Sequence, residues 1–151
     1  MKKTGFTLVE ILIVVIILGI LAAIVIPQFT EASNDARKSA LVSDLQTVRS
    51  QLELFKVQHL DTYPGCFGAN FSAANFLTQL QTKTNSDGTA GGTLGPYIQK
   101  FPANPFMNDD RTVREVTLDA NGDAPIAGTE GWWFDPAVGK FGANHIDYRD
   151  Y

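Results

Sequence analysis

Glu10 is the residue whose position most clearly implies chemistry. It is the only charged residue among the 21 residues from Phe6 to Ile26, where almost every other side chain is apolar. On insertion scales, a charged side chain at the centre of a membrane-spanning helix costs about 2.5–3.5 kcal/mol, and less near the interface. Such a carboxylate either pairs with a cation, which makes it a functional residue, or reaches back to the lipid headgroups.

A second candidate site lies near the carboxyl-terminal third of the chain. Asp119, Asn121 and Asp123 have the alternating oxygen spacing with which a calcium-binding loop begins. Glu130 stands at the twelfth position counted from Asp119, but Gly122 falls at the fourth position instead of the sixth, which excludes an EF-hand. A calcium site of another kind and a plain Asn-Gly turn both remain open.

The remaining reactive side chains form no catalytic motif. His59 and His145 are expected at the surface, and Cys66, in a Pro-Gly-Cys turn, as a free and partly buried thiol. A single cysteine excludes an internal disulfide and a multi-cysteine zinc site. With 12 Lys+Arg against 16 Asp+Glu, the formal net charge of −4 disfavours binding to nucleic acid. We therefore expect neither an enzyme nor a nucleic-acid-binding protein.

The element that positions Glu10 is an apolar helix. At about 1.5 Å per residue, residues 6–26 extend over roughly 30 Å, which matches the hydrocarbon core of a bilayer. Lys2 and Lys3 precede this segment, so the positive-inside rule places the amino terminus in the cytoplasm. A secretory signal peptide fits poorly, because Leu21-Ala22-Ala23 is followed by further branched apolar residues. A plain signal anchor fits the length but gives no reason for Glu10.

An amphipathic helix follows the apolar one. Pro27 removes a helical hydrogen bond, and together with Gly19 it predicts a kink or a weakened stretch. From residue 28 to residue 59, apolar or small side chains recur every three or four positions and charged side chains occupy the other face, which we interpret as solvated. The turn residues 61–65 predict that the helix ends near His59 or Leu60.

The rest of the chain predicts one short helix and three strands. Residues 70–81 form the helix, with Ser72 or Asn70 as its N-cap. Strands are expected at 112–118, 132–135 and 140–143, the last two joined by a four-residue loop. Three antiparallel strands packed on the long helix give an α+β fold. Of the adjacent Trp132 and Trp133, one is expected in the core and the other either there or against a neighbouring subunit.

The amino-terminal residues carry a family resemblance. Gly5-Phe6-Thr7-Leu8-Val9-Glu10, behind a short basic leader and before an unbroken apolar helix, resembles the signal of type IV pilins and type II secretion pseudopilins. The resemblance implies a type IV pilin-like fold, cleavage between Gly5 and Phe6 by a prepilin peptidase, and N-methylation of the new Phe6 amine. It further implies that the helix unwinds before Pro27 during assembly.

Three later segments are similar to major pseudopilins of the G type: YPG after the long helix, GPYIQKFPANPF in the middle, and GWWFDPAVGKFGAN near the end. The single Cys66 means that the cysteine-pair loop common in type IV pilins is absent, which favours the pseudopilin. This resemblance also implies a structural calcium ion in the carboxyl-terminal loop, where Asp119, Asn121 and Asp123 lie. No other cofactor is expected.

Cleavage would create the cation that Glu10 lacks. Phe6 would then carry a free and largely protonated α-amino group. Glu10, four residues on, would pair with this amine in its own chain or in a neighbour, and pairing between chains would fix the axial register of a helical assembly. Removal of residues 1–5 also removes Lys2 and Lys3 and changes the net charge from −4 to −6.

These inferences combine into one prediction. Residues 1–5 are a leader, 6–26 a transmembrane and filament-core helix, and 27–151 a periplasmic globular domain that includes the amphipathic helix 28–59. The chain is expected in the bacterial inner membrane as a single-pass protein that polymerises into a pseudopilus and drives protein export. The implied partners are further copies of the chain, other pseudopilins, the prepilin peptidase, an inner-membrane assembly platform and membrane lipid. A type IV pilus pilin, for adhesion, motility or DNA uptake, and a signal-anchored periplasmic binding domain remain as alternatives.

Overall fold

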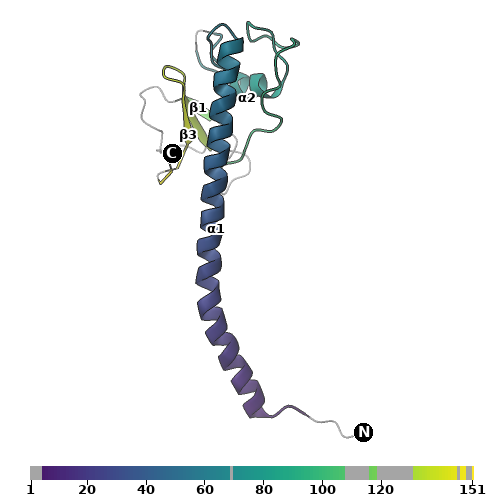
Figure 1. Cartoon of the computed structure of the whole chain (residues 1–151), viewed down its shortest axis with the longest axis vertical. Coiled ribbons are helices and arrows are strands. Elements are labelled where there is room, and N and C mark those ends of the chain that lie inside the picture. The colour runs from purple at the N-terminus through teal and green to yellow at the C-terminus, as the bar shows by residue number, and fades with distance from the viewer. Residues whose placement is uncertain (1–4, 69, 108–115, 119–130, 146, 149–150) are drawn as a thin grey trace. The chain divides into compact units, whose positions relative to one another are not determined.

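A computed structural model describes residues 5–68, 70–107, 116–118, 131–145, 147–148 and 151. The elements follow in the order helix α1 (Leu8–Gln58), helix α2 (Ala73–Gln81) and strands β1 (Val116–Leu118), β2 (Trp132–Asp135) and β3 (Lys140–Ala143) (Figure 1). The chain divides into two compact units, Met1–Arg37 and Lys38–Tyr151, and α1 contributes residues to both. This order of two helices and three strands confirms the predicted α+β class.

The second part of α1 forms one wall of the core in the unit Lys38–Tyr151, which we call the globular unit. Its buried side chains follow one another at spacings of four and three residues, the pattern of an amphipathic helix. All are almost fully buried: Leu41, Leu45, Val48, Leu52 and Phe55. The amphipathic pattern is thus confirmed from Leu41 onward, whereas residues 28–40 of the predicted stripe are helical but exposed. α1 ends at Gln58, one residue before the nearer of the two predicted ends.

The opposite wall of the core is built from α2, the connector after it and the sheet. These apolar side chains are buried in one cluster with the stripe on α1: Phe76, Leu80, Phe101, Val116, Trp132, Phe134, Phe141 and Ala143. Burial of a large apolar side chain contributes about 1.5–3 kcal/mol to folding. The sheet therefore gains from α1 the packing surface that three short strands lack by themselves.

Helix α2 begins where its N-cap predicts. The backbone N–H of Asn75 donates a hydrogen bond to the Ser72 hydroxyl at 3.3 Å, which identifies Ser72 and not Asn70 as the cap. The buried side chain of Gln79 then joins two loops. Its amide oxygen accepts the N–H of Gly65 at 2.7 Å, and its amide nitrogen donates to the carbonyl of Gly88 at 2.9 Å.

The sheet has the order β1-β2-β3 and is mixed. Strands β2 and β3 form the predicted antiparallel hairpin, in which Trp132 pairs with Ala143 and Asp135 with Lys140. The prediction of three antiparallel strands is wrong for β1, because it pairs with β2 in parallel. Thirteen residues separate β1 from β2, and a connection of about a dozen residues or more lets a chain return to the same end of a sheet.

Both tryptophans of β2 are fully buried, so the second ring takes the first of its two expected places, in the core and not against a neighbouring subunit. Trp132 donates its ring N–H to the carbonyl of Pro102 at 3.1 Å, and Trp133 donates to that of Ala143 at 3.2 Å. Gly142 makes room for the second ring, since a Cβ atom there would lie 2.5 Å from a ring carbon of Trp133. The side chain of Lys140 covers the same ring.

His59 is also buried, which corrects its expected position at the surface. It continues the apolar stripe of α1 four residues after Phe55, and the two rings stack with centroids 3.7 Å apart. The carbonyl of Phe55 accepts from Nδ1 at 2.9 Å, and Nε2 is hydrogen-bonded to the Thr84 hydroxyl at 2.8 Å. Both ring nitrogens are satisfied, which is how a polar ring is tolerated in a core. His145 is partly exposed.

Candidate functional site

Thr7 and Glu10 form a reciprocal cap at the first turn of α1. The Thr7 backbone N–H and hydroxyl both donate to Oε2 of Glu10, at 2.8 and 2.7 Å. In return, the backbone N–H of Glu10 donates to the Thr7 hydroxyl oxygen at 3.3 Å. With Thr7 as N-cap and Glu10 three residues later, this is a capping box. This cap explains why the helix begins at Leu8. The capping carboxylate belongs to Glu10, the single charged residue of the apolar segment.

The cap uses only part of the hydrogen-bonding capacity of Glu10. A carboxylate has two oxygens and roughly four acceptor positions. Within the described residues, Oε2 accepts from Thr7, whereas Oε1 accepts no hydrogen bond. Phe6 lies immediately before the cap and is 84% exposed. The geometry thus leaves Oε1 of Glu10 available to a cation, while Oε2 caps the first turn of α1.

The side chains that follow Glu10 have no cover within the chain. Every residue from 5 to 40 is exposed, and the large apolar side chains between Phe6 and Ile26 are 41% to 84% exposed. A contiguous apolar surface of this size requires lipid or protein around it. Among the described residues, α1 is also the one helix that is long and apolar enough to cross a membrane.

The predicted kink positions lie inside an unbroken helix in the isolated chain. α1 continues through Gly19 and Pro27, and among the described residues no atom outside its own helical turn lies within 4 Å of a Cβ atom placed on Gly19. The hydroxyl of Thr30 donates to the carbonyl of Ile26 at 3.2 Å, next to the proline that has no N–H of its own. Unwinding on assembly therefore stays a prediction for this stretch.

The candidate calcium ligands Asp119, Asn121 and Asp123 lie outside the described residues. Within the part of the chain that the structure describes, no group of three or more His, Cys, Asp and Glu side chains is placed to hold a metal ion. The calcium site stays a prediction. Cys66 is a free, half-buried thiol as expected, and burial raises its pKa.

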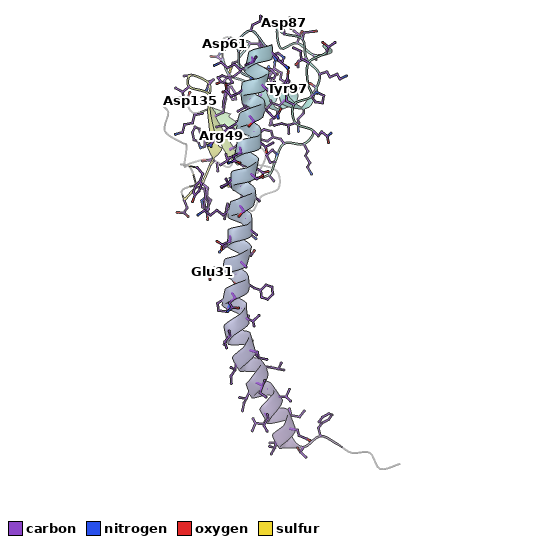
Figure 2. The ribbon with its side chains drawn as sticks, viewed as in Figure 1. Glu31, Arg49, Asp61, Asp87, Tyr97 and Asp135 are labelled. Carbon is purple, nitrogen blue, oxygen red and sulfur yellow. The ribbon has the colours of Figure 1, made fainter. Side chains whose placement is uncertain are left out.

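The globular unit contains two charged residues that the sequence pattern placed on a solvated face. The side chain of Arg49 extends from α1 (Figure 2). Its guanidinium is half-buried and donates from Nε and Nη2 to the carbonyl of Phe141 in β3, at 2.9 and 2.8 Å. Burial lowers the pKa of Arg49 and raises the pKa of Asp44. Both residues flank the buried stripe, next to Val48 and Leu45, and that position on the helical wheel was the available signal.

Comparison with known proteins gives this arrangement its context. Residues 1–26 match a family model described as the prokaryotic N-terminal methylation motif. Proteins named type II secretion system core protein G are similar to most of the chain. The one from Vibrio cholerae serotype O1 is 31% identical over 136 residues, which are 85% of this chain and 88% of that protein. The chain belongs to the core protein G family of type II secretion systems.

Other members of the core protein G family are similar to the chain at the same level of identity. The Pseudomonas aeruginosa protein is 32% identical over 108 residues, 71% of this chain and 70% of that protein, and the Escherichia coli K12 protein is 32% identical over 110 residues, 72% and 70%. No solved structure matches the chain. The resemblance to a G-type pseudopilin is therefore confirmed, and the methylation motif covers Gly5, Phe6 and Glu10.

Proposed function

We propose that this chain is the structural subunit of a type II secretion pseudopilus. The observation that carries the proposal is the amino terminus of α1, where a methylation motif, a capped Glu10 and an exposed apolar helix coincide in a member of the core protein G family. The work of such a subunit is mechanical and not catalytic. The apolar helices of many copies form the filament core, and the globular units form its exterior.

Maturation supplies the charge that Glu10 needs. A prepilin peptidase cleaves between Gly5 and Phe6, and the new Phe6 amine becomes methylated. The amine then approaches the oxygen of Glu10 that the cap leaves unused. An ammonium and a carboxylate buried in an apolar core are tolerable only as a pair, so this contact selects one register between neighbouring subunits.

The chain waits for assembly as a single-pass protein of the inner membrane, with the globular unit in the periplasm. Lys2 and Lys3 on the cytoplasmic side support this orientation. An inner-membrane assembly platform then draws subunits from the lipid into the filament, together with other pseudopilins. Growth of the filament drives folded substrates out of the periplasm.

The test is to produce the full chain in bacteria with and without a prepilin peptidase and a type II assembly platform. Intact-mass analysis is expected to show loss of residues 1–5 and gain of one methyl group, only when the peptidase is present. Electron microscopy of sheared material is expected to show filaments for the native chain and few or none for Glu10→Ala, although that variant still enters the membrane.

Three results would contradict the proposal. An uncleaved and unmethylated amino terminus would favour a signal-anchored periplasmic domain. Normal filaments from Glu10→Ala would remove the role given to that carboxylate. Filaments that form only with the platform of a retractable surface pilus would favour a type IV pilin.

A further inference from the structure

Two half-buried charges on α1 lack a charged partner. In the described part of the chain, Arg49 spends two donors on the carbonyl of Phe141 but meets no carboxylate, and Asp44 accepts no hydrogen bond and meets no cation. A charge that is partly removed from water without an opposite charge destabilises its own fold. Two such charges of opposite sign on one helix suggest that each is paired outside the chain.

Their positions on α1 prevent them from pairing within one molecule. A helix turns by about 100° per residue, so the separation of five residues from Asp44 to Arg49 places them roughly 140° apart around the axis. Leu45 and Val48, which face the core, lie between them on the helical wheel. Asp44 and Arg49 thus mark the two opposite edges along which the helix meets the globular unit.

We propose that Arg49 of one copy of the chain pairs with Asp44 of the next copy in the filament. The inference rests on the proposed function and names the contact between neighbouring globular units. Because the two residues lie on opposite edges, the contact is heterologous: each copy offers Arg49 on one side and Asp44 on the other. In a row of copies joined in this way, one terminal copy still has a free Arg49 and the other a free Asp44. Further copies can therefore add at both ends without limit.

The donors of Arg49 make the pairing chemically specific. Nε and Nη2 are directed to Phe141, which holds the guanidinium in one orientation against β3. Arginine carries five N–H donors in a planar fork, so further donors remain for the carboxylate of a neighbour. The guanidinium therefore needs no rearrangement within its own chain to receive Asp44.

The register of this pair agrees with that of the amino-terminal pair. Matching Arg49 to Asp44 of the next copy displaces that copy by five residues, about 7.5 Å along the helix axis. Matching Glu10 to the Phe6 amine of the next copy displaces it by four residues, about 6 Å, in the same direction. Flexible side chains absorb the difference, so one axial step between copies satisfies both contacts.

The test is site-directed cross-linking in assembling filaments. All variants are full-length chains that carry Cys66→Ser, so that the introduced cysteines are the only thiols. A short bis-maleimide reagent is used, because an Arg–Asp pair holds the two backbones further apart than a disulfide allows. The chains compared are Asp44→Cys alone, Arg49→Cys alone, an equal mixture of these two, and the double variant.

A heterologous contact predicts a distinct outcome for each sample. The double variant is expected to give a ladder of covalent multimers, the mixture to give dimers only, and each single variant to give little product. The matched control is Asp44→Cys with Ser50→Cys, because Ser50 is exposed on another face of α1 and its hydroxyl bonds to its own helix. That pair is expected to give at least fivefold less multimer than the double variant.

A charge test avoids the loss of the bond to Phe141. Asp44→Lys removes no hydrogen bond of the described fold and places a cation opposite the Arg49 of the next copy, so filament yield is expected to fall at least fivefold. Asp44→Glu, which keeps the charge, is expected to restore most of the yield. Circular dichroism melting of each chain in detergent verifies that the variants fold.

The results separate this inference from the proposed function. Filaments of the native chain with no ladder from the double variant, or with dimers from a single variant as abundant as those from the mixture, overturn the Asp44–Arg49 contact alone. Normal filament yield from Asp44→Lys overturns it as well. A processed native chain that forms no filaments at all overturns the proposed function, and this contact with it.

Discussion

The carboxylate of Glu10 is bound by Thr7 of the same chain, through a backbone N–H at 2.8 Å and a hydroxyl at 2.7 Å. The two donors at the start of α1 are thus already paired within a single subunit. This pairing matters in lipid, where an unpaired backbone group is costly. Because one oxygen of Glu10 stays unused, the cap and a pair with the Phe6 amine are compatible. Under the proposed function, the same carboxylate caps the start of α1 and selects the neighbouring subunit.

Thr7→Val tests the cap directly. Valine has nearly the shape of threonine but removes the hydroxyl that donates to Glu10 and accepts its N–H. Loss of a helix cap costs about 1 kcal/mol, so fraying of the first turn is expected to increase about fivefold. The amide hydrogens of Glu10 and Ile11 are bound to the hydroxyl and the carbonyl of Thr7. Their exchange, measured on the full chain in detergent micelles, is expected to become faster by a similar factor.

Thr7→Ser is the matched control for that measurement, because serine keeps the hydroxyl and the capping geometry. Exchange at Glu10 and Ile11 is expected to stay within a factor of two of the native chain. Equal exchange rates in Thr7→Val and Thr7→Ser would mean that the hydroxyl does not hold the first turn.

Gly139→Ala tests the hairpin between β2 and β3. Gly139 has a φ of +71°, and an added Cβ atom would collide with the hydroxyl of Tyr63, which donates to Glu53 at 2.8 Å. Overpacking of this kind costs about 1–3 kcal/mol, so the melting temperature of the globular unit is expected to fall by several degrees. The measurement is circular dichroism melting in detergent.

Gly91→Ala separates the cost of the collision with Tyr63 from the cost of placing alanine in a left-handed backbone conformation. Gly91 has a φ of +90°, but no atom of the described residues lies within 4 Å of the position of its added Cβ. This variant therefore carries the cost of the left-handed conformation without the contact to Tyr63, and a smaller decrease in melting temperature is expected. A decrease as large as that of Gly139→Ala would assign the whole effect to the backbone.

Gln79→Met tests the link between two loops. Methionine fills a similar volume but leaves the N–H of Gly65 and the carbonyl of Gly88 without their buried partners. An unsatisfied buried polar group costs about 1–3 kcal/mol, so unfolding in urea is expected at a clearly lower concentration. Gln46→Met, at an exposed position of α1, is the control and is expected to leave the midpoint unchanged. Equal midpoints for both variants would contradict the role of Gln79.

The sequence predicted features that depend on local chemistry. The N-cap Ser72, the end of α1 near His59 and the hairpin loop 136–139 follow from residue types at fixed spacings, and the structure confirms them. The methylation motif is of the same kind, because a processing signal is read in a linear segment. Such features need no knowledge of what packs against them.

Features that depend on distant residues were not predictable in the same way. The parallel pairing of β1 with β2 depends on the path of a long connection, and the burial of His59 depends on Thr84 and on Phe67 from later loops. The sequence pattern predicted a solvated Arg49, because its partner, the carbonyl of Phe141, lies 92 residues away in the chain. Whether a residue at the edge of an apolar stripe is buried or exposed therefore cannot be predicted until the rest of the core is known.

Asp44→Asn tests whether the unpaired carboxylate costs stability. Burial raises the pKa of Asp44 in the folded chain, so the folded state holds the proton more tightly than the unfolded state does. Its contribution to stability is then fully present below the unfolded pKa and is lost as pH rises through the folded pKa. Asparagine removes the charge, so the variant is expected to melt at a higher temperature than the native chain at pH 7.

The difference in melting temperature is expected to shrink as the pH falls through the folded pKa of Asp44, and to vanish below the unfolded pKa, where both side chains are neutral. Melting curves of unassembled full-length chain in detergent, from pH 3 to pH 8, measure it. Gln51→Glu, which adds a carboxylate at another half-buried position of α1, shows the effect of a new charge at the edge of the stripe. A native chain that is more stable than Asp44→Asn at pH 7 would mean that Asp44 is stabilised within its own fold, and the reason to seek its partner in a second copy would disappear.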